Sequence, residues 1–525
     1  MKTSSWAKLE KQAGRLRGRR IDDLFAADSD RYHNFSLLRH NMVLDYSRQL
    51  LDDDALDELL KLPDEFSLGH RIAGLFGGER VNNTENRAAL HMALRADSDA
   101  DFAVDDVSVM EDVDRVRDDF LAFADDVRNG ERTGHSGKAF TTVVNIGVGG
   151  SHLGPMLVAD ALADENSPDC FFVSGAGGQQ LLSTLSKVDP ETTLFVVCSK
   201  SFSTQETMLN AEAAREWLAE QLSEEAVADH FAAVSVNQEA MDEFGIADDA
   251  RFEMWNWVGG RYSVWSAVGL AAAIVIGSEA FRDLLSGART IDNHFRNAPW
   301  AENLPVMLAL IELWNRNFLR MNSHAVLPYE RRLQDFPEYL QQLEMESLGK
   351  SVQRDGEPVE SATVPVIWGT HGSNAQHSYL QALHQGTLKV FVDFIGVAST
   401  EDELAEHKQV ALANMLAQAE ALRSGRSVND VGDSEIAKHR VQPGNVPSVI
   451  LLLKDLDPVA LGSLIALYEH KVFALSVFWD INPFDQWGVE LGKTLAGKYE
   501  GLLSDDIAST EGDSIVNQIR DWQEG

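Results

Sequence analysis

Short apolar runs alternate with amphipathic segments between residues 141 and 236. The runs are rich in Val, Ile and Phe, which favours strands buried on both faces, whereas the intervening segments carry apolar residues at helical spacing. The predicted strands are 141–146, 170–174, 194–198 and 231–236, and the predicted helices include 180–185 and 208–222. This alternation predicts a doubly wound, mainly parallel sheet, in which ligands bind beyond the carboxyl ends of the strands.

A second block of the same kind follows later in the chain. Its predicted strands are 364–368, 388–397 and 448–453, and its longest predicted helix is 402–422. Both blocks contain a strand that runs into a turn with Gly and Ser and then a helix, at 141 and again at 364. The pattern therefore predicts two sheets of related topology, an α/β fold.

The remaining segments read as mainly helical. Residues 45–62 and 86–95 have helical periodicity, and a long helical region is predicted over 279–348, interrupted near Pro305 and Pro328. We expect a helical N-terminal part that packs on the second lobe, two α/β lobes and a helical tail. The expected boundaries are 1–135, 136–278, 279–500 and 501–525.

Composition agrees with a folded protein and limits its partners. The chain has 525 residues, 44% of them hydrophobic, and carries a net charge of −37 from 82 acidic and 45 basic side chains. Such a surface repels nucleic acid and anionic lipid, so neither is an expected partner, and a phosphate site would have to be locally basic. The acidity indicates either solubility alone or adaptation to a salt-rich interior.

Nothing in the sequence predicts a membrane, a disulfide framework or a metal motif. The two cysteines, Cys170 and Cys198, fall in or beside predicted buried strands, and no paired metal-ligand spacing accompanies them. The N-terminus lacks the apolar segment of a secretory signal, and the longest apolar run, about 268–277, is too short for a span. We expect a soluble, cytoplasmic protein.

A hydroxyl-rich loop follows the predicted strand 194–198. Lys200 is surrounded there by Ser199, Ser201, Ser203 and Thr204, immediately before a predicted helix. Free N–H groups and the helix dipole favour an anion at such a place, which predicts a phosphate cradle. Ser and Thr are also ordinary N-caps, and this stretch alone favours neither interpretation.

A glycine turn, 147–155, follows the strand 141–146. Gly150 allows close approach of a ligand to the backbone, and the Ser151 hydroxyl could face that ligand. The spacing does not match the G-x-G-x-x-G dinucleotide fingerprint. If parallel strands carry both this turn and the hydroxyl loop, the two can face one crevice.

Further chemistry-bearing residues are individually ambiguous. Arg261 is predicted at the head of a buried helix, where it needs a partner or a ligand. Gln342 and Glu346 share a helix face, and Gln486, Glu490 and Lys493 follow a helical spacing, yet solvated surface groups show the same patterns. The spacing of His371, His377 and His384 fits no zinc site, and an imidazole used for proton transfer is as plausible there as a ligand. Arg87 and Arg95 could line a site, but the pattern favours surface salt bridges.

Taken together, these stretches resemble the glucose-6-phosphate isomerase family, also called phosphoglucose isomerase. The motifs are G-V-G-G-S-H-L-G-P, S-K-S-F-S-T-Q-E-T, G-G-R-Y-S, M-E-S-L-G-K, the segment ending H-Q-G-T, and F-D-Q-W-G-V-E-L-G-K, in the family's order. The resemblance implies two α/β sheets of the sugar-isomerase (SIS) type. It also implies interconversion of glucose 6-phosphate and fructose 6-phosphate without a cofactor or metal, in a homodimer.

The resemblance also implies a role for each motif residue. The phosphate would be held by Gly150, Ser151, Ser199, Lys200, Ser201 and Thr204. The catalytic residues would be Glu346 as the base, Arg261 near the reacting carbons, and His377 and Lys493 for ring opening. Gln342 and Gln486 would line the sugar site, and Glu206 would orient a His377 supplied by the neighbouring subunit.

The chain departs from the family pattern at His152 and Leu348, where Asp and Asn are commoner, and we expect these changes to alter rate or affinity without loss of function. Two other functions compete with the isomerase. A non-catalytic sugar-phosphate sensor would keep the hydroxyl loop but need not keep Glu346, Arg261 and Lys493, all of which are present. An isomerase that also accepts mannose 6-phosphate would differ only in pocket shape.

Overall fold

The structure is a computed structural model that describes residues 3–399, 404–432, 435–504 and 514–524. The chain divides into two compact units, Met1–Pro483 and Phe484–Gly525. The smaller unit contains the helices α23 (Glu490–Leu503) and α24 (Ser514–Glu524). The larger unit contains both sheets.

The first sheet is wholly parallel and has the strand order β6-β5-β7-β8-β9. Its strands are β5 (Thr142–Ile146), β6 (Asp169–Val173), β7 (Thr193–Cys198), β8 (Phe231–Ser235) and β9 (Arg251–Glu253). Its connecting helices are α8 (Leu153–Leu162), α9 (Gly178–Leu185), α10 (Gln205–Gln221), α11 (Val227–His230) and α12 (Gln238–Phe244). Because β6 and β7 lie on opposite sides of β5, the strand order reverses between β5 and β7, where doubly wound sheets bind ligands.

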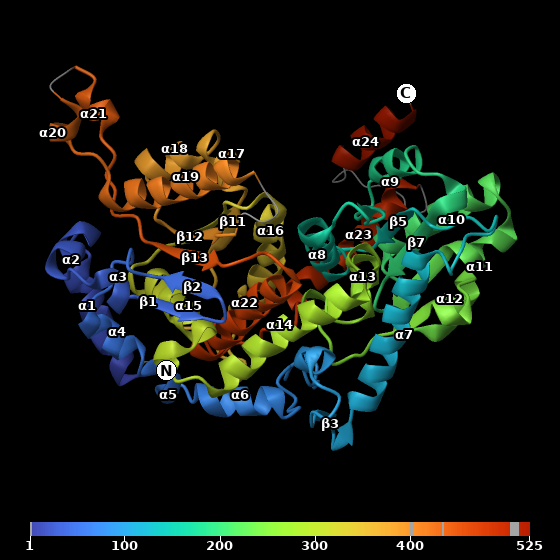
Figure 1. Cartoon of the computed structure of the whole chain (residues 1–525), viewed down its shortest axis with the longest axis horizontal. Helices are drawn as coiled ribbons and strands as arrows, with labels where there is room; N and C mark the ends of the chain where they lie inside the picture. The colour runs from blue at the N-terminus through green and yellow to red at the C-terminus, as the bar shows by residue number, and fades with distance from the viewer. Residues whose placement is uncertain (1–2, 400–403, 433–434, 505–513, 525) are drawn as a thin grey trace. The chain divides into compact units, whose positions relative to one another are not determined.

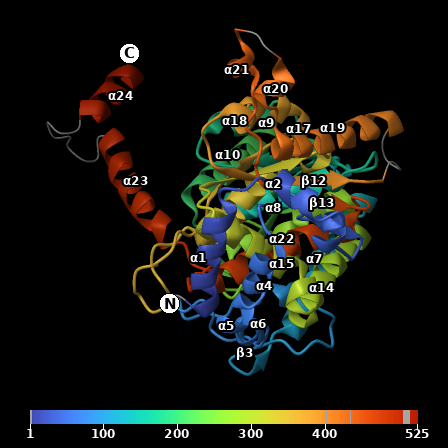
Figure 2. The same ribbon diagram turned by 90° about the vertical axis from the view of Figure 1, so that its left-hand side faces the viewer.

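The second sheet has the order β1-β2-β13-β12-β10-β11; β2 pairs antiparallel with both of its neighbours, and all other pairs are parallel. Its strands are β1 (Ser36–Arg39), β2 (Met42–Asp45), β10 (Ser323–Pro328), β11 (Val366–Gly369), β12 (Val390–Val397) and β13 (Ser448–Leu453). Figures 1 and 2 show the helices α17 (Gly372–Gln376), α18 (Leu380–Gln385) and α19 (Ala405–Ser424) over one face, where Phe394 and Leu383 belong to one apolar core. The predicted α/β class with two related, mainly parallel sheets is confirmed.

Two long helices, α14 (Ser278–Asn297) and α22 (Pro458–Phe478), pack side by side between the two sheets (Figure 1). Within the described residues, α22 is long and apolar enough to cross a membrane by length and composition, but its most apolar window is entirely buried. Burial on every side is the signature of a core helix. α22 nevertheless carries the buried charged residues Glu469, His470 and Lys471.

The other helices form the N-terminal part and the connections between the sheets. They include α1 (Ser4–Leu16), α2 (Ile21–Ala27), α3 (Arg31–Asn34), α4 (Asp53–Leu59), α5 (Leu62–Glu65), α6 (Leu68–Phe76), α7 (Met110–Asn129), α13 (Leu270–Ile276), α15 (Leu304–Leu313), α16 (Phe336–Leu340), α20 (Val428–Val431) and α21 (Ala437–Arg440). A two-stranded ribbon pairs β3 (Ala103–Val104) with β4 (Val107–Ser108).

Several local predictions are wrong. The helix expected over 45–62 begins only at Asp53, because Asp45 ends β2, which pairs with β13. The helix expected over 86–95 is an isolated bridge followed by a 3-10 turn, and the helical region 279–348 is broken by β10, which lies between β11 and β12. For β2 and β10, pairing with a distant segment overrides the local periodicity.

Candidate active site

The glycine turn after β5 packs directly against the segment that carries Arg261. A Cβ built on Gly150 would overlap the carbonyl group of Gly260 and lie 2.7 Å from the amide nitrogen of Arg261. Gly149 has a φ of +59°, and its Cβ would lie 2.9 Å from the Gln342 side-chain nitrogen. Glycine is therefore needed here so that three motifs distant in the sequence can meet.

The hydroxyl loop between β7 and α10 is held by hydrogen bonds among its own side chains and by the segment at the end of β8. The Ser199 hydroxyl donates to the Thr204 hydroxyl at 3.1 Å, and the Ser203 hydroxyl donates to that of Ser201 at 2.8 Å. Phe202 takes a left-handed φ of +51° and buries its ring. Among the described residues, the Thr204 side chain at the N-cap accepts no capping hydrogen bond from α10, which argues against the purely structural interpretation of this loop.

Lys200 is anchored by backbone carbonyls rather than by carboxylates. Its Nζ donates to the carbonyl oxygens of Val258 at 3.0 Å and Asn256 at 3.3 Å. Burial, together with the positive charge of Arg87, lowers the pKa of Lys200 to about 8. An anion bound in the loop would restore the protonated form.

Arg261 and Glu346 face each other next to the glycine turn. The Arg261 side chain is 2% exposed, and its Nη1 lies 3.4 Å from Oε2 of Glu346, whose side chain is 25% exposed. The guanidinium also donates to the Ser347 hydroxyl at 2.6 Å and to the carbonyl of Pro483. A fixed cation beside a carboxylate that reaches solvent can stabilise charge while the carboxylate moves a proton.

Arg261 does not begin a long helix as predicted. It lies in a 3-10 turn, Gly260–Tyr262, and the buried apolar helix α13 starts only at Leu270. The hydroxyl of Tyr262 lies 3.0 Å from that of Ser347, so the residue after Glu346 is held from two sides. Ser347 was missed as a site residue, although its position inside the M-E-S-L-G-K motif is a usable signal.

Gln342 and Glu346 lie on a π-helical turn, Gln341–Glu346, that continues α16. Such widened turns occur often at functional sites. Gln342 faces Gly149 and Glu346 faces Arg261, so both side chains border the region of the glycine turn. Leu348, one of the departures from the family pattern, is fully buried.

The four remaining predicted residues lie on or beside the helices α17, α10 and α23. His377 is the exposed C-cap of α17, and Glu206 is in the first turn of α10. In the smaller unit, Lys493 pairs with Glu490 at 3.0 Å on α23, whereas Gln486 precedes that helix, so its predicted helical placement is wrong. The roles of all four residues stay predictions.

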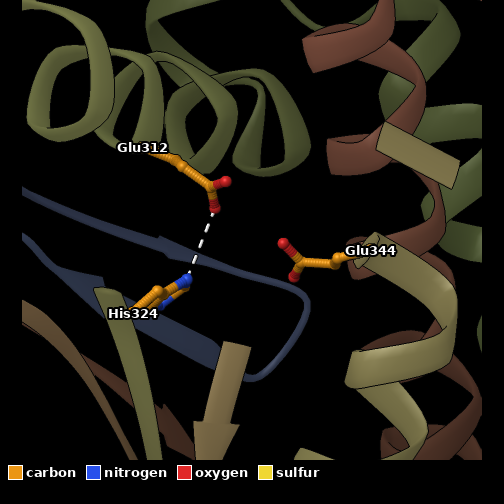
Figure 3. Close-up of side chains that lie close together, drawn as sticks. All are labelled: Glu312, His324 and Glu344. Carbon is orange, nitrogen blue, oxygen red and sulfur yellow. Dashed lines mark ion pairs between the residues drawn. The ribbon is translucent and has the colours of Figure 1, made fainter. Parts of the chain in front are cut away.

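A buried cluster on the second lobe is the described group best suited to a metal ion. Figure 3 shows Glu312, His324 and Glu344 pointing toward one another. The ammonium group of Lys471, however, lies 2.6 Å from Glu312 and 2.8 Å from Glu344. A protein cation thus already neutralises the carboxylates that a metal would need.

The two arginines that were expected in surface salt bridges both form ion pairs. The ion pairs of one of them are fully buried. Arg87 lies 3.5 Å from Glu85 at the surface. Arg95 is fully buried between Asp292 and Glu469, each at 2.6 Å, which corrects the prediction of a surface salt bridge. Its guanidinium stacks over the ring of Trp265.

Comparison with known proteins gives one consistent family. The sequence matches the family described as phosphoglucose isomerase over residues 45–519. It is 43% identical to the glucose-6-phosphate isomerase of Chlorobium luteolum, with 100% of this chain and 98% of the relative covered. It is 48% identical to that of Cupriavidus metallidurans, with 91% and 90% covered.

A solved structure supports the same family assignment. The crystal structure of a glucose-6-phosphate isomerase from Chlamydia trachomatis superposes with a TM-score of 0.87 at 32% identity, covering 98% of each chain.

Proposed function

The chain belongs to the phosphoglucose isomerase family, and from this premise we propose that it interconverts D-glucose 6-phosphate and D-fructose 6-phosphate in glycolysis and gluconeogenesis. The observation that carries the site assignment is the Arg261–Glu346 pair at 3.4 Å, directly beside the Gly150 turn. A substrate phosphate held by the turn and the hydroxyl loop would place the sugar next to that pair.

The first step is the opening of the pyranose ring. It requires a proton to leave O1 and another to reach O5. Imidazole and ammonium groups transfer protons near neutral pH, so His377 and Lys493 are assigned to this step. The exposure of His377 at the end of α17 is compatible with its serving a neighbouring subunit, where Glu206 would orient it.

The second step is isomerisation. The Glu346 carboxylate takes the proton from C2 of the open-chain aldose, and the electron pair forms a cis-enediolate across C1 and C2. Arg261 stabilises the negative charge as it develops, because the guanidinium is already fixed by Ser347. A proton then passes from the C2 hydroxyl to O1, and Glu346 returns the carbon-bound proton to C1, so that C2 becomes the carbonyl of the ketose. Only protons move in these steps, so the reaction balances without a hydride acceptor.

The phosphate provides orientation. The hydroxyls of Ser151, Ser199, Ser201 and Thr204 are donors, and Lys200 supplies the positive charge that the acidic surface otherwise lacks. Anchoring the phosphate end of the sugar restricts the motion of C1 and C2, so less entropy is lost when they reach the transition state. Gln342 and Gln486 are assigned to the sugar hydroxyls.

We also propose a cytoplasmic homodimer. Considered alone, the unit Phe484–Gly525 exposes Leu491, Leu495 and Tyr499 at four-residue spacing along α23. An apolar helical stripe of this kind requires an apolar partner surface, which supports an interface. Mixed dimers of Glu346→Gln and His377→Ala chains should regain part of the activity that each homodimer lacks; no regain would contradict a site shared by two subunits.

A coupled assay of glucose 6-phosphate formation from fructose 6-phosphate, with and without chelator, tests the function. We expect turnover that chelator leaves unchanged. A metal requirement would contradict the cofactor-free mechanism. Fructose without the phosphate should be a poor substrate, whereas turnover of mannose 6-phosphate at a comparable rate would widen the assignment.

A further inference from the structure

One buried ammonium group ties the turn that carries Glu346 to the helical core. Lys471 on α22 is 1% exposed, and its Nζ lies 2.8 Å from Oε1 of Glu344 and 2.6 Å from Oε2 of Glu312. Glu312 belongs to α15, and Glu344 belongs to the π-helical turn two residues before Glu346. The two carboxylates therefore link three elements through a single cation.

The cluster extends to a second cation and a third carboxylate. His324 on β10 lies 3.4 Å from Glu312 and 3.0 Å from Asp393 of β12, and the Tyr468 hydroxyl donates to Asp393 at 2.9 Å. Three acids and two bases leave one negative charge without a partner. Charge balance in a dry interior therefore requires one additional proton.

Glu344 is the carboxyl of the cluster that most readily accepts this proton. Burial raises the pKa of this carboxyl to about 7, although Lys471 opposes the shift. Burial also acts against ionisation of Glu312, yet Lys471 and His324 hold its pKa at about 2. The ammonium thus neutralises Glu312 and also donates a hydrogen bond to Glu344, whose raised pKa reflects its burial.

The turn is fixed on both sides of Glu346. Lys471 holds Glu344 on the preceding side, and Arg261 and Tyr262 hold the Ser347 hydroxyl on the following side. Glu346 itself reaches solvent and lies 3.4 Å from Arg261. With both neighbours anchored, the carboxylate has a defined direction before substrate arrives.

We propose that Lys471 is a positioning residue of the isomerase, which acts through Glu344 to hold the π-helical turn and direct Glu346 at the reacting carbons. This inference rests on the proposed role of Glu346. A purely structural buried ion pair is the competing explanation, and the two differ in what happens to turnover when the protein stays folded.

Glu344→Met is the decisive variant. It removes the tie to the turn but leaves the Lys471–Glu312 pair intact. We expect kcat to fall about 100-fold, as for an approximately 1 Å misplacement of a reacting group, with KM and the binding of inorganic phosphate unchanged within threefold. The melting temperature should stay near that of the wild type.

Lys408→Met is the matched control. Lys408 is a buried lysine that lies 2.6 Å from Glu330, so its removal also breaks a buried ion pair. We expect this variant to lose stability but keep its kcat. Glu344→Met with wild-type kcat, or an equal loss of kcat in Lys408→Met, would overturn the proposal.

Two further variants complete the test. If Glu344→Met does not fold, Lys471→Met decides, with the same kcat criterion measured on its folded fraction. Glu346→Gln is assayed in parallel: if it keeps its turnover, the proposed function fails, whereas if it loses turnover and Glu344→Met does not, only the role of Lys471 fails.

Discussion

Gly150→Ala tests whether the glycine turn sets the position of Arg261. The added methyl group would overlap the Gly260 carbonyl and lie 2.7 Å from the Arg261 amide nitrogen. Both obstacles are backbone atoms, so no flexible side chain can yield. Reaching ordinary carbon contact distances requires the two backbones to separate by about 1.5 Å in total.

Such a shift should affect catalysis more than folding. Overpacking of this size costs about 1–3 kcal/mol of stability, which a protein of this length can tolerate. Moving Arg261 by about 1 Å from Glu346 should lower kcat/KM for fructose 6-phosphate about 100-fold. A coupled assay at matched concentrations of folded protein measures the loss.

Gly178→Ala is the control for the effect of adding a methyl group. Gly178 begins α9, and no described atom lies within 4 Å of a Cβ built there. This variant should retain wild-type kcat/KM. Near wild-type activity of Gly150→Ala would refute the inferred packing of the turn against the arginine segment.

Three further predictions concern charge. Lys200 must be protonated to bind phosphate, and burial lowers its pKa to about 8, so KM should rise about tenfold per pH unit above pH 8. Lys200→Arg should abolish this rise, because arginine stays protonated. A wild-type KM that does not change with pH in this range would contradict the role of Lys200. Arg95→Met leaves the buried carboxylates of Asp292 and Glu469 without their cation, so the free energy of unfolding measured in urea should fall by about 3–5 kcal/mol. A fall of less than about 1 kcal/mol would show that these two ion pairs contribute little to stability. Screening the net charge of −37 by raising NaCl from about 0.1 to about 1 M should raise the melting temperature, whereas no rise would favour solubility alone as the reason for the acidic surface.

The sequence was most informative where local chemistry and tertiary structure agree. The apolar run before the hydroxyl loop predicted a buried strand, and β7 has six consecutive buried residues there. β10 lies inside the region 279–348 that was predicted to be helical. Its strand conformation depends on pairing with β11 and β12, which no local window contains.

Buried charge was the least predictable feature. Lys471, Glu469 and Arg95 look like surface residues in sequence, since lysine, glutamate and arginine are rarely buried without partners. Their partners are at Glu312, Glu344 and Asp292, far away along the chain. Only the packing of α22 against α14 and α15 reveals that these charges are internal.

The most direct measurement is turnover by Glu346→Gln, with the binding of fructose 6-phosphate followed separately. The amide keeps the size of the side chain but is too weak a base to take the C2 proton, so kcat should fall by several orders of magnitude while binding stays nearly intact. Near wild-type turnover would contradict the assignment of Glu346 as the base, and with it the proposed mechanism.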